Sequence, residues 1–251
     1  MTAPAWRPTV IRVGATYPDM SGLVDGLSPG CEQEAPILCL ALEQGSMRVL
    51  VDTGLPEIDW VRTQFGKVTQ TAEEVLADAL RQFAGWEPAD VGYVINTHLH
   101  FDHCGGNREF PNARFVVQRR EYDFAMAPSL GQEAIYPAHL FDRSAVDYFD
   151  WLFVDGDHEL FRGLRLLLTP GHSPGHQSVV FEATEGVTVY TGDAVCRMES
   201  LEQRRAPGLH TDFAAGLASI ERIRSVAERV IPSHDTRILP GQRDGFFPVP
   251  A

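Results

Sequence analysis

The chain has 251 residues, 44% of them hydrophobic, which is enough to bury a core without disulfides. Its 21 basic and 34 acidic side chains give a net charge of −13, which disfavours binding to nucleic acids and anionic membranes. No apolar run approaches the roughly 20 residues that cross a bilayer, and the scattered cysteines and the start of the chain indicate neither disulfides nor an export signal. We therefore expect a cytoplasmic protein, monomeric or homodimeric, that acts on a small molecule.

The first half of the chain alternates short apolar runs with an amphipathic segment. Thr71 and Glu74 form a capping-box pattern ahead of a predicted helix that Gly85 ends. A second helix is expected after the last strand of this half. The predicted strands are 36–42, 47–51, 91–96 and 114–118.

The second half repeats the alternation. Its predicted strands are 164–169, 177–182, 187–191 and 229–231. A long helix begins with Asp212 as N-cap, and its predicted apolar stripe is Phe213, Leu217, Ile220, Ile223 and Val226. The pattern predicts one domain, 1–251, of mixed α/β class, with two mixed sheets between helices. The irregular stretch at about 121–151 is interpreted as an insertion that covers a substrate.

The run His98-Leu-His100-Phe-Asp102-His103 carries four groups that can bind a divalent metal. The first two histidines follow a strand and point the same way, because strand side chains alternate. Short links prevent all four groups from meeting at one ion. Two adjacent ions, one at each pair, satisfy the geometry.

Further ligands are needed, and the sequence offers them where later strands end. Each candidate follows an apolar run and a small or turn residue, from which a side chain can reach over a sheet edge. These candidates are His172, Asp193 and His234. Imidazole and carboxylate ligands suit two divalent ions, with zinc as the first candidate and manganese, iron or cobalt as alternatives.

This six-residue run, with the later His, Asp and His in order, resembles the metallo-β-lactamase superfamily over nearly the whole chain. The resemblance implies a four-layer αββα sandwich. It implies that one metal is held by His98, His100 and His172, and the other by Asp102, His103 and His234. It makes Asp193 the bridging ligand, and Asp52 the acceptor of a hydrogen bond from a ligand imidazole.

Within the superfamily, the run through Asn107 is particularly similar to N-acyl-homoserine lactonases and pyridoxolactonase. Asp102 and Asp193 are then the candidate catalytic carboxylates, Asp193 by orienting water and passing a proton to the leaving alkoxide. The resemblance implies a quorum-quenching lactonase. Thioester or ester hydrolysis of the glyoxalase-II type is the alternative, and β-lactam hydrolysis ranks lower. A third hypothesis is that the protein is not an enzyme but a binding protein that the metal stabilises and that turns over no substrate.

One position departs from the lactonase pattern. Those enzymes carry a Tyr three residues after the bridging Asp, where this chain has Cys196, a weak hydrogen-bond donor. The candidate substrate contacts are therefore Cys196, Tyr122, Tyr136 and His139, and Arg197 could also assist. The aromatic residues near the insertion are interpreted as packing, or alternatively as an apolar wall for an acyl chain.

Overall fold

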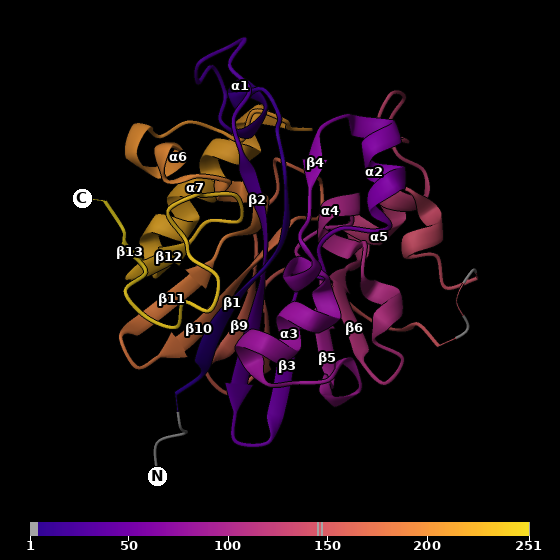
Figure 1. Ribbon diagram of the computed structural model, residues 1–251. Coiled ribbons are helices and arrows are strands. Elements are labelled where there is room, and N and C mark those ends of the chain that lie inside the picture. Colours follow the sequence, from indigo (N-terminus) through magenta and orange to yellow (C-terminus); the bar gives the residue numbers. More distant parts are fainter. Residues whose placement is uncertain (1–4, 145, 147, 251) are drawn as a thin grey trace.

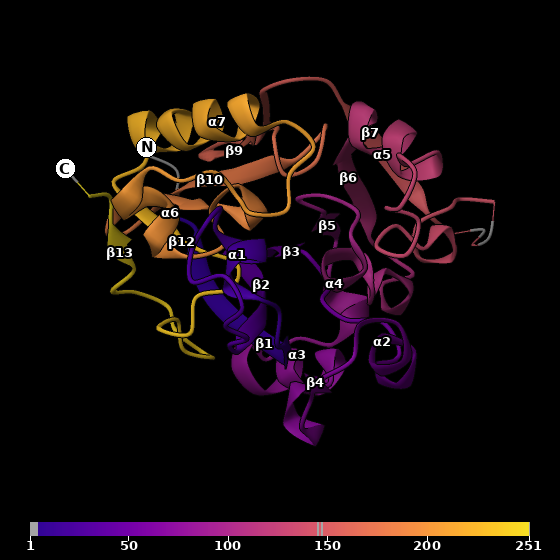
Figure 2. The same ribbon diagram turned by 90° about the horizontal axis from the view of Figure 1, so that it is seen from above.

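Two β-sheets face each other and helices cover their outer sides (Figures 1 and 2). The computed structural model describes residues 5–144, 146 and 148–250. The first sheet has seven strands in the order β4-β1-β2-β3-β5-β6-β7, and the second has six in the order β13-β12-β11-β10-β9-β8. Both sheets are mixed, because β3, β5, β6 and β7 run parallel in the first and β11 and β12 run parallel in the second.

The bounds of the strands are β1 Arg7–Thr16, β2 Ala35–Gln44, β3 Met47–Val51, β4 Val68–Thr69, β5 Tyr93–Ile95, β6 Arg114–Gln118, β7 Asp150–Val154, β8 His158–Phe161, β9 Leu164–Leu168, β10 Gln177–Ala183, β11 Gly186–Tyr190, β12 Arg229–Ile231 and β13 Phe247–Pro248. The α-helices are α1 Met20–Leu23, α2 Ile58–Phe65, α3 Leu76–Ala84, α4 Phe101–Cys104, α5 Arg119–Met126, α6 Met198–Gln203 and α7 Phe213–Val226.

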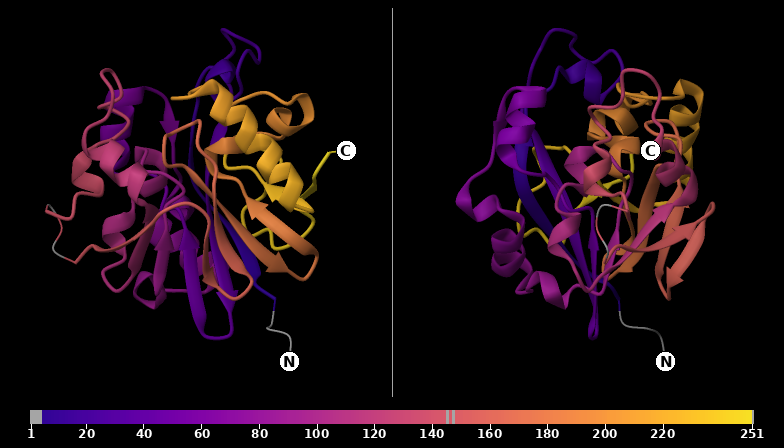
Figure 3. Two further views of the ribbon diagram at one scale, coloured as in Figure 1. Left: turned by 180° about the vertical axis from the view of Figure 1, so that it is seen from behind. Right: turned by 90° about the vertical axis from the view of Figure 1, so that its right-hand side faces the viewer.

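Strand β2 explains the layering. Its residues are buried on both faces, and successive side chains alternate between two cores. Ile37 and Cys39 pack toward α3, whereas Leu38 and Leu40 pack into the space between the sheets. On the far side, α7 lies across the outer face of the second sheet (Figure 3). The expected four-layer αββα sandwich is therefore confirmed.

All eight predicted strands are present, but the sequence analysis missed β1, β7, β8 and the two-residue strands β4 and β13. Strand β7 contains Trp151, so the predicted insertion ends before this residue. Residues 145 and 147 of that insertion lie outside the described part of the chain. The helix expected after Thr71 begins with a 3-10 turn, Ala72–Glu74, before α3 starts at Leu76.

One predicted core position is wrong. Phe213 is 46% exposed, because at the first turn of α7 its ring contacts His210 instead of the sheet. The buried face of α7 instead includes the small residues Gly216 and Ser219. The loop before His172 approaches this face so closely that a Cβ on Gly171 would lie 2.3 Å from the Gly216 Cα, so glycine is required at position 171.

In the described part of the chain, no helix is long and apolar enough to span a bilayer.

Tyr190 joins the two sheets by donating a hydrogen bond from its hydroxyl to the carbonyl oxygen of Leu38, at 2.6 Å. We expect Tyr190→Phe to lower the free energy of unfolding by about 1–2 kcal/mol, because the bond is buried. Urea unfolding measures the change. The control is Tyr148→Phe, which removes an exposed hydroxyl bonded to the Arg108 carbonyl oxygen and should cost less than about 0.5 kcal/mol. Equal stability of the Tyr190→Phe variant and the parent would contradict this role.

Candidate metal centre

The candidate ligands follow strands at one end of the sandwich. Asp52 comes after β3, and the run from His98 to His103 comes after β5 and continues into α4. The remaining candidates follow β9, β11 and β12, and they are His172, Asp193 and His234. Parallel strands bring their carboxyl ends to one edge, which is why residues from distant parts of the sequence meet there.

Three imidazole rings face one another in the first group. His98 Nε2 lies 2.9 Å from His100 Nδ1, and His172 Nε2 lies 3.2 Å and 3.0 Å from these two atoms. A tetrahedral ion with ligands at about 2.0–2.1 Å places its ligand nitrogens roughly 3.3 Å apart. The spacing of these three nitrogens therefore fits a divalent cation.

Asp193 lies between this group and a second one. Its Oδ2 is 3.3 Å from His172 Nε2, and its Oδ1 is 3.2 Å from His103 Nε2 and 3.1 Å from His234 Nε2. Asp102 Oδ2 approaches the same two histidines at 3.9 and 4.0 Å. The second group is thus Asp102, His103 and His234, and the two oxygens of Asp193 face one group each.

Burial and charge divide the histidines of the site into two kinds. Burial, reinforced by neighbouring imidazoles, lowers the pKa of His98 and His100 well below the usual value and also lowers that of His172. Burial acts the same way on His103 and His234, but nearby carboxylates, Asp193 foremost, outweigh it and raise both pKa values. The three-histidine group therefore keeps neutral rings with free lone pairs, and the second group is the more anionic half.

Asp52 forms a hydrogen bond with His103 of the second group, on the side of the ring that faces away from the other ligands. It is fully buried, and its Oδ2 lies 2.8 Å from His103 Nδ1, while its Oδ1 accepts a hydrogen bond from the Thr97 backbone N–H at 2.7 Å. Its φ of +59° is uncommon for a residue with a side chain and directs the carboxylate toward these donors. The opposite nitrogen, His103 Nε2, is buried, makes no hydrogen bond and faces Asp193 Oδ1 at 3.2 Å, which is where a cation shared by the two residues would lie.

Two residues that the sequence analysis did not assign to the site hold Asp193. The Ser233 hydroxyl donates to Asp193 Oδ1 at 2.7 Å, and His176 Nε2 accepts from the Asp193 backbone N–H at 2.9 Å. Gly192 permits this approach, since it has a φ of +52° and a Cβ there would lie 2.6 Å from His176 Nε2. The only sequence signal for His176 was its place in the run Gly171-His-Ser-Pro-Gly-His176.

The centre opens into a cavity of about 370 Å³. Asp102, His172, Asp193 and His234 line its polar part. The rest of its wall is mostly apolar and comes from residues that the sequence analysis did not single out, among them Tyr17, Leu23, Phe65, Phe101, Ile135 and Leu209. Phe65 and Phe101 stack with ring centroids 4.1 Å apart.

Of the candidate substrate contacts, only Cys196 lines this cavity. Tyr136 packs its ring on His100, with centroids 4.5 Å apart, but directs its hydroxyl to Glu121. The Tyr122 hydroxyl accepts from the Arg143 backbone N–H, and the exposed His139 packs against Trp60. Arg197 is buried beside Glu199. The aromatic residues Phe141, Phe149 and Trp151 pack in the core, as expected, whereas Tyr148 of the same predicted cluster is 41% exposed.

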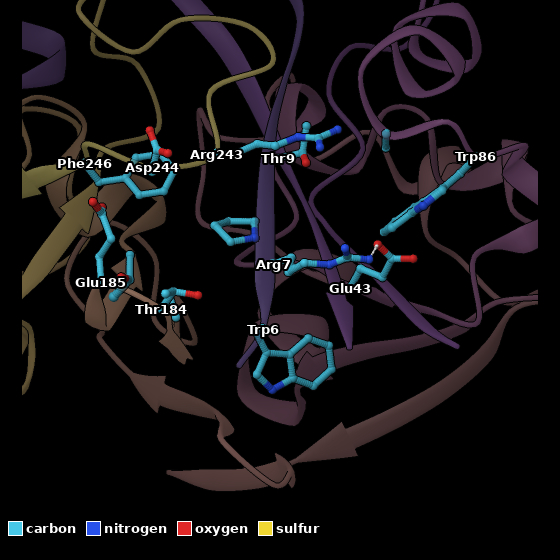
Figure 4. A pocket seen from close by; sticks show the side chains of 14 residues that line it. Trp6, Arg7, Thr9, Glu43, Trp86, Thr184, Glu185, Arg243, Asp244 and Phe246 are labelled. Carbon is cyan, nitrogen blue, oxygen red and sulfur yellow. Dashed lines mark hydrogen bonds and ion pairs between the residues drawn. The ribbon is translucent and has the colours of Figure 1, made fainter. Parts of the chain in front are cut away.

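A larger cavity, of about 540 Å³, lies toward the opposite ends of the strands, where β1 begins and β2 ends (Figure 4). It is lined by charged side chains that pair with one another or with neighbours, such as Arg7 with Glu43 and Glu185 with Arg229. None of the metal-binding groups found among the described residues faces it. The smaller cavity is therefore the candidate active site.

His176 gives the site a pH-dependent stability. Burial lowers its pKa from 6.5 to about 3, so the folded protein binds this proton less readily than the unfolded chain does. Its contribution to stability is complete above about pH 6.5 and decreases as the pH falls toward 3. Between pH 7 and pH 5, the metal-free parent should lose about 2 kcal/mol more stability than His176→Gln. Urea unfolding at both pH values tests this, and identical losses in the two proteins would contradict it.

Comparisons with known proteins agree with this geometry. The model of the metallo-beta-lactamase superfamily matches residues 34–234. An N-acyl homoserine lactonase of Bacillus thuringiensis is 34% identical over 234 residues, which cover 88% of each chain. Among solved structures, an N-acyl homoserine lactone hydrolase with the product N-hexanoyl-L-homoserine at its catalytic metal centre is 31% identical. It has a TM-score of 0.78 and covers 94% of this chain and 95% of its own. A quorum-quenching N-acyl homoserine lactone lactonase is also 31% identical, with a TM-score of 0.77 and 94% of each chain covered. The chain therefore belongs to the metallo-β-lactamase superfamily.

Proposed function

We propose that this protein is a metal-dependent hydrolase that opens the ring of N-acyl homoserine lactones. The observation that carries the proposal is the convergence of seven metal-binding side chains, of which Asp102, His172, Asp193 and His234 line a largely apolar cavity. A lactone needs a polarised ester carbonyl, and an acyl substituent needs an apolar wall. The relatives named as lactonases, similar over nearly the whole chain, support the same reaction.

The residues fit two divalent ions. His98, His100 and His172 would hold one, Asp102, His103 and His234 would hold the other, and Asp193 would bridge them. Such a pair, when bound, lowers the pKa of water to about 7 and polarises a carbonyl. We propose zinc, because neutral imidazoles with carboxylates are its usual ligands, and manganese, iron or cobalt accept the same set.

Asp193 is the residue we propose to move the proton. Burial raises its pKa, but His234, His103 and His172 outweigh this and keep the pKa well below the usual value, so the carboxylate is ionised at rest. Hydrogen bonds from Ser233 and to His176 fix its orientation. An ionised, immobile carboxylate can orient the attacking water and carry a proton to the leaving alkoxide. Asp102, at the cavity wall, is the second candidate catalytic carboxylate.

The Phe65–Phe101 stack is the proposed contact for the acyl chain. Both rings line the cavity together with Leu23 and Ile135. Ile135 belongs to the predicted insertion, which supports our proposal that this segment of the single domain covers the substrate. Cys196, 2% exposed, lines the cavity at the position where the resemblance to lactonases implies Tyr, and burial raises the pKa of its thiol. A neutral thiol donates weakly, so we assign no carbonyl-polarising role to it.

We further propose that the enzyme acts in the cytoplasm as a monomer or homodimer, and that it quenches quorum signals. All four cysteines are unpaired, which suits a reducing compartment. The net charge of −13 favours an uncharged small substrate over nucleic acid or an anionic membrane.

Elemental analysis combined with a hydrolysis screen tests the reaction class. We expect two metal equivalents per chain and proton release from N-acyl homoserine lactones. S-lactoylglutathione, assayed by its free thiol, should be cleaved at least about 100-fold less efficiently. Preferential thioester cleavage would favour the glyoxalase-II type of hydrolase, and bound metal without turnover would favour a binding protein.

Asp193→Asn tests the proton carrier. We expect kcat to fall by at least about 100-fold, since the amide cannot accept and return a proton. Metal content measured on the same sample separates this effect from loss of a ligand. The control is Asp78→Asn on α3, an exposed carboxylate paired with Arg81, which should leave kcat unchanged. Unchanged lactone turnover in Asp193→Asn would contradict the assignment.

Phe65→Ala tests the acyl wall. We expect KM for an N-decanoyl substrate to rise about tenfold and KM for an N-butanoyl substrate to rise much less, because only the longer chain covers the removed ring. Leu130→Ala is the control, since this residue is 97% exposed and does not line the cavity. Equal changes in KM for the two substrates would mean that the acyl chain does not lie against Phe65.

A further inference from the structure

Glu121, on helix α5, is a fully buried carboxylate with no cation beside it in the described part of the chain. Four donors surround it. Its Oε1 accepts from the Leu99 backbone N–H at 3.1 Å and from the Tyr136 hydroxyl at 3.3 Å. Its Oε2 accepts from the Ser173 hydroxyl at 2.6 Å and from the Gly175 backbone N–H at 3.0 Å. Four hydrogen bonds compensate the cost of burying this carboxylate.

All four donors lie in or against segments that carry the three-histidine group. Leu99 stands between His98 and His100, and Ser173 and Gly175 belong to the loop of His172. Tyr136 packs its ring on His100. Leu99 belongs to the same run as Asp102 and His103 but adjoins His98 and His100, and among the described residues none of the four donors adjoins Asp193 or His234. The hydrogen bonds of Glu121 are therefore made next to the three-histidine group, at Leu99 between His98 and His100 and at Ser173 beside His172.

The loop of His172 is built to reach this carboxylate. A Cβ on Gly175 would lie 2.3 Å from the Glu121 backbone N and 2.6 Å from its Cα. Only glycine permits so close an approach of this loop to α5. The close contact between the His172 loop and helix α5 thus depends on glycine at position 175.

We propose that Glu121 is a positioning residue that holds His98, His100 and His172 at the spacing one metal ion requires, and that it sets the affinity of this half of the centre. The inference rests on the proposed function in assuming that the three histidines bind a metal. Because its carboxylate links two loops that are more than 70 residues apart in sequence, their mutual distance depends on it. Groups that orient ligands typically change metal affinity or activity by about 10- to 100-fold when removed.

Glu121→Gln is the sharpest test, because it keeps the shape of the side chain. Each carboxylate oxygen of Glu121 accepts hydrogen bonds from two donors. In glutamine an NH₂ group replaces one of these oxygens. Whichever way the amide is turned, this NH₂ group faces two donors and cannot accept their hydrogen bonds. We expect zinc affinity to fall about 10- to 100-fold for one of two equivalents only. At a buffered zinc concentration where the parent retains two equivalents, the variant should retain one. Ser173→Ala, which removes a single donor, should give an intermediate loss.

Val117→Ala on strand β6 is the control, because it opens a cavity in the core cluster that contains Tyr136 but removes none of the four hydrogen bonds to Glu121. Its thermal unfolding temperature is expected to fall while both zinc equivalents stay bound.

If the parent itself binds no zinc, the proposed function fails. If the parent binds two equivalents and Glu121→Gln retains both, or loses both in parallel, the positioning role is wrong. Should Glu121→Gln fail to fold, the result for Ser173→Ala decides in the same way.

Discussion

The convergence of three neutral imidazoles is the constraint on which the rest of the structure depends. Their facing nitrogens lie 2.9–3.2 Å apart, closer than buried lone pairs remain without a proton or a cation between them. Burial keeps the rings neutral, so a shared cation is the partner that satisfies all three. The surrounding layers then have to hold rings from two separate loops at this distance, and the hydrogen bonds of Glu121 serve that requirement.

The two halves of the centre are supported by different parts of the fold. Asp52, at the end of β3, bonds to the second group directly through His103. Glu121, from α5, supports the first group indirectly through the backbone and side chains of two loops. Asp193 lies between them and is held from the second sheet by Ser233. The sandwich therefore contributes to the site from both sheets and from the helical layer outside the first one.

The strand pattern and the ligand positions were predictable, because both depend on local sequence. Apolar runs of four to eight residues mark buried strands, and the run His98–His103 compresses four ligands into one turn. Strand β1 was missed because Pro8, Arg12 and Gly14 interrupt its apolar pattern. Phe213 was assigned to the core because a 3.6-residue period does not reveal where a helix extends beyond the sheet it covers.

The direction of a side chain could not be predicted. Tyr136 and Tyr122 both lie in or near the expected insertion, yet one directs its hydroxyl to Glu121 and the other packs beside Trp151. The cavity wall comes from five or more separate segments, so Phe65 carried no local signal of its role. Glu121 carried none either, since a charged residue on a short helix is usually solvated.

The apolar wall and the polar base of the cavity impose opposite requirements on one short segment. Phe101 belongs to the wall, and its neighbours His100 and Asp102 belong to the base. A single turn, α4, satisfies both, because its residues project in different directions around the helix axis. Substrate selection and metal binding are therefore coupled through this turn. Any change that rotates α4 to alter the wall would also move Asp102 and His103, so variation in acyl preference is better tolerated at Phe65, which lies on α2 away from the ligands.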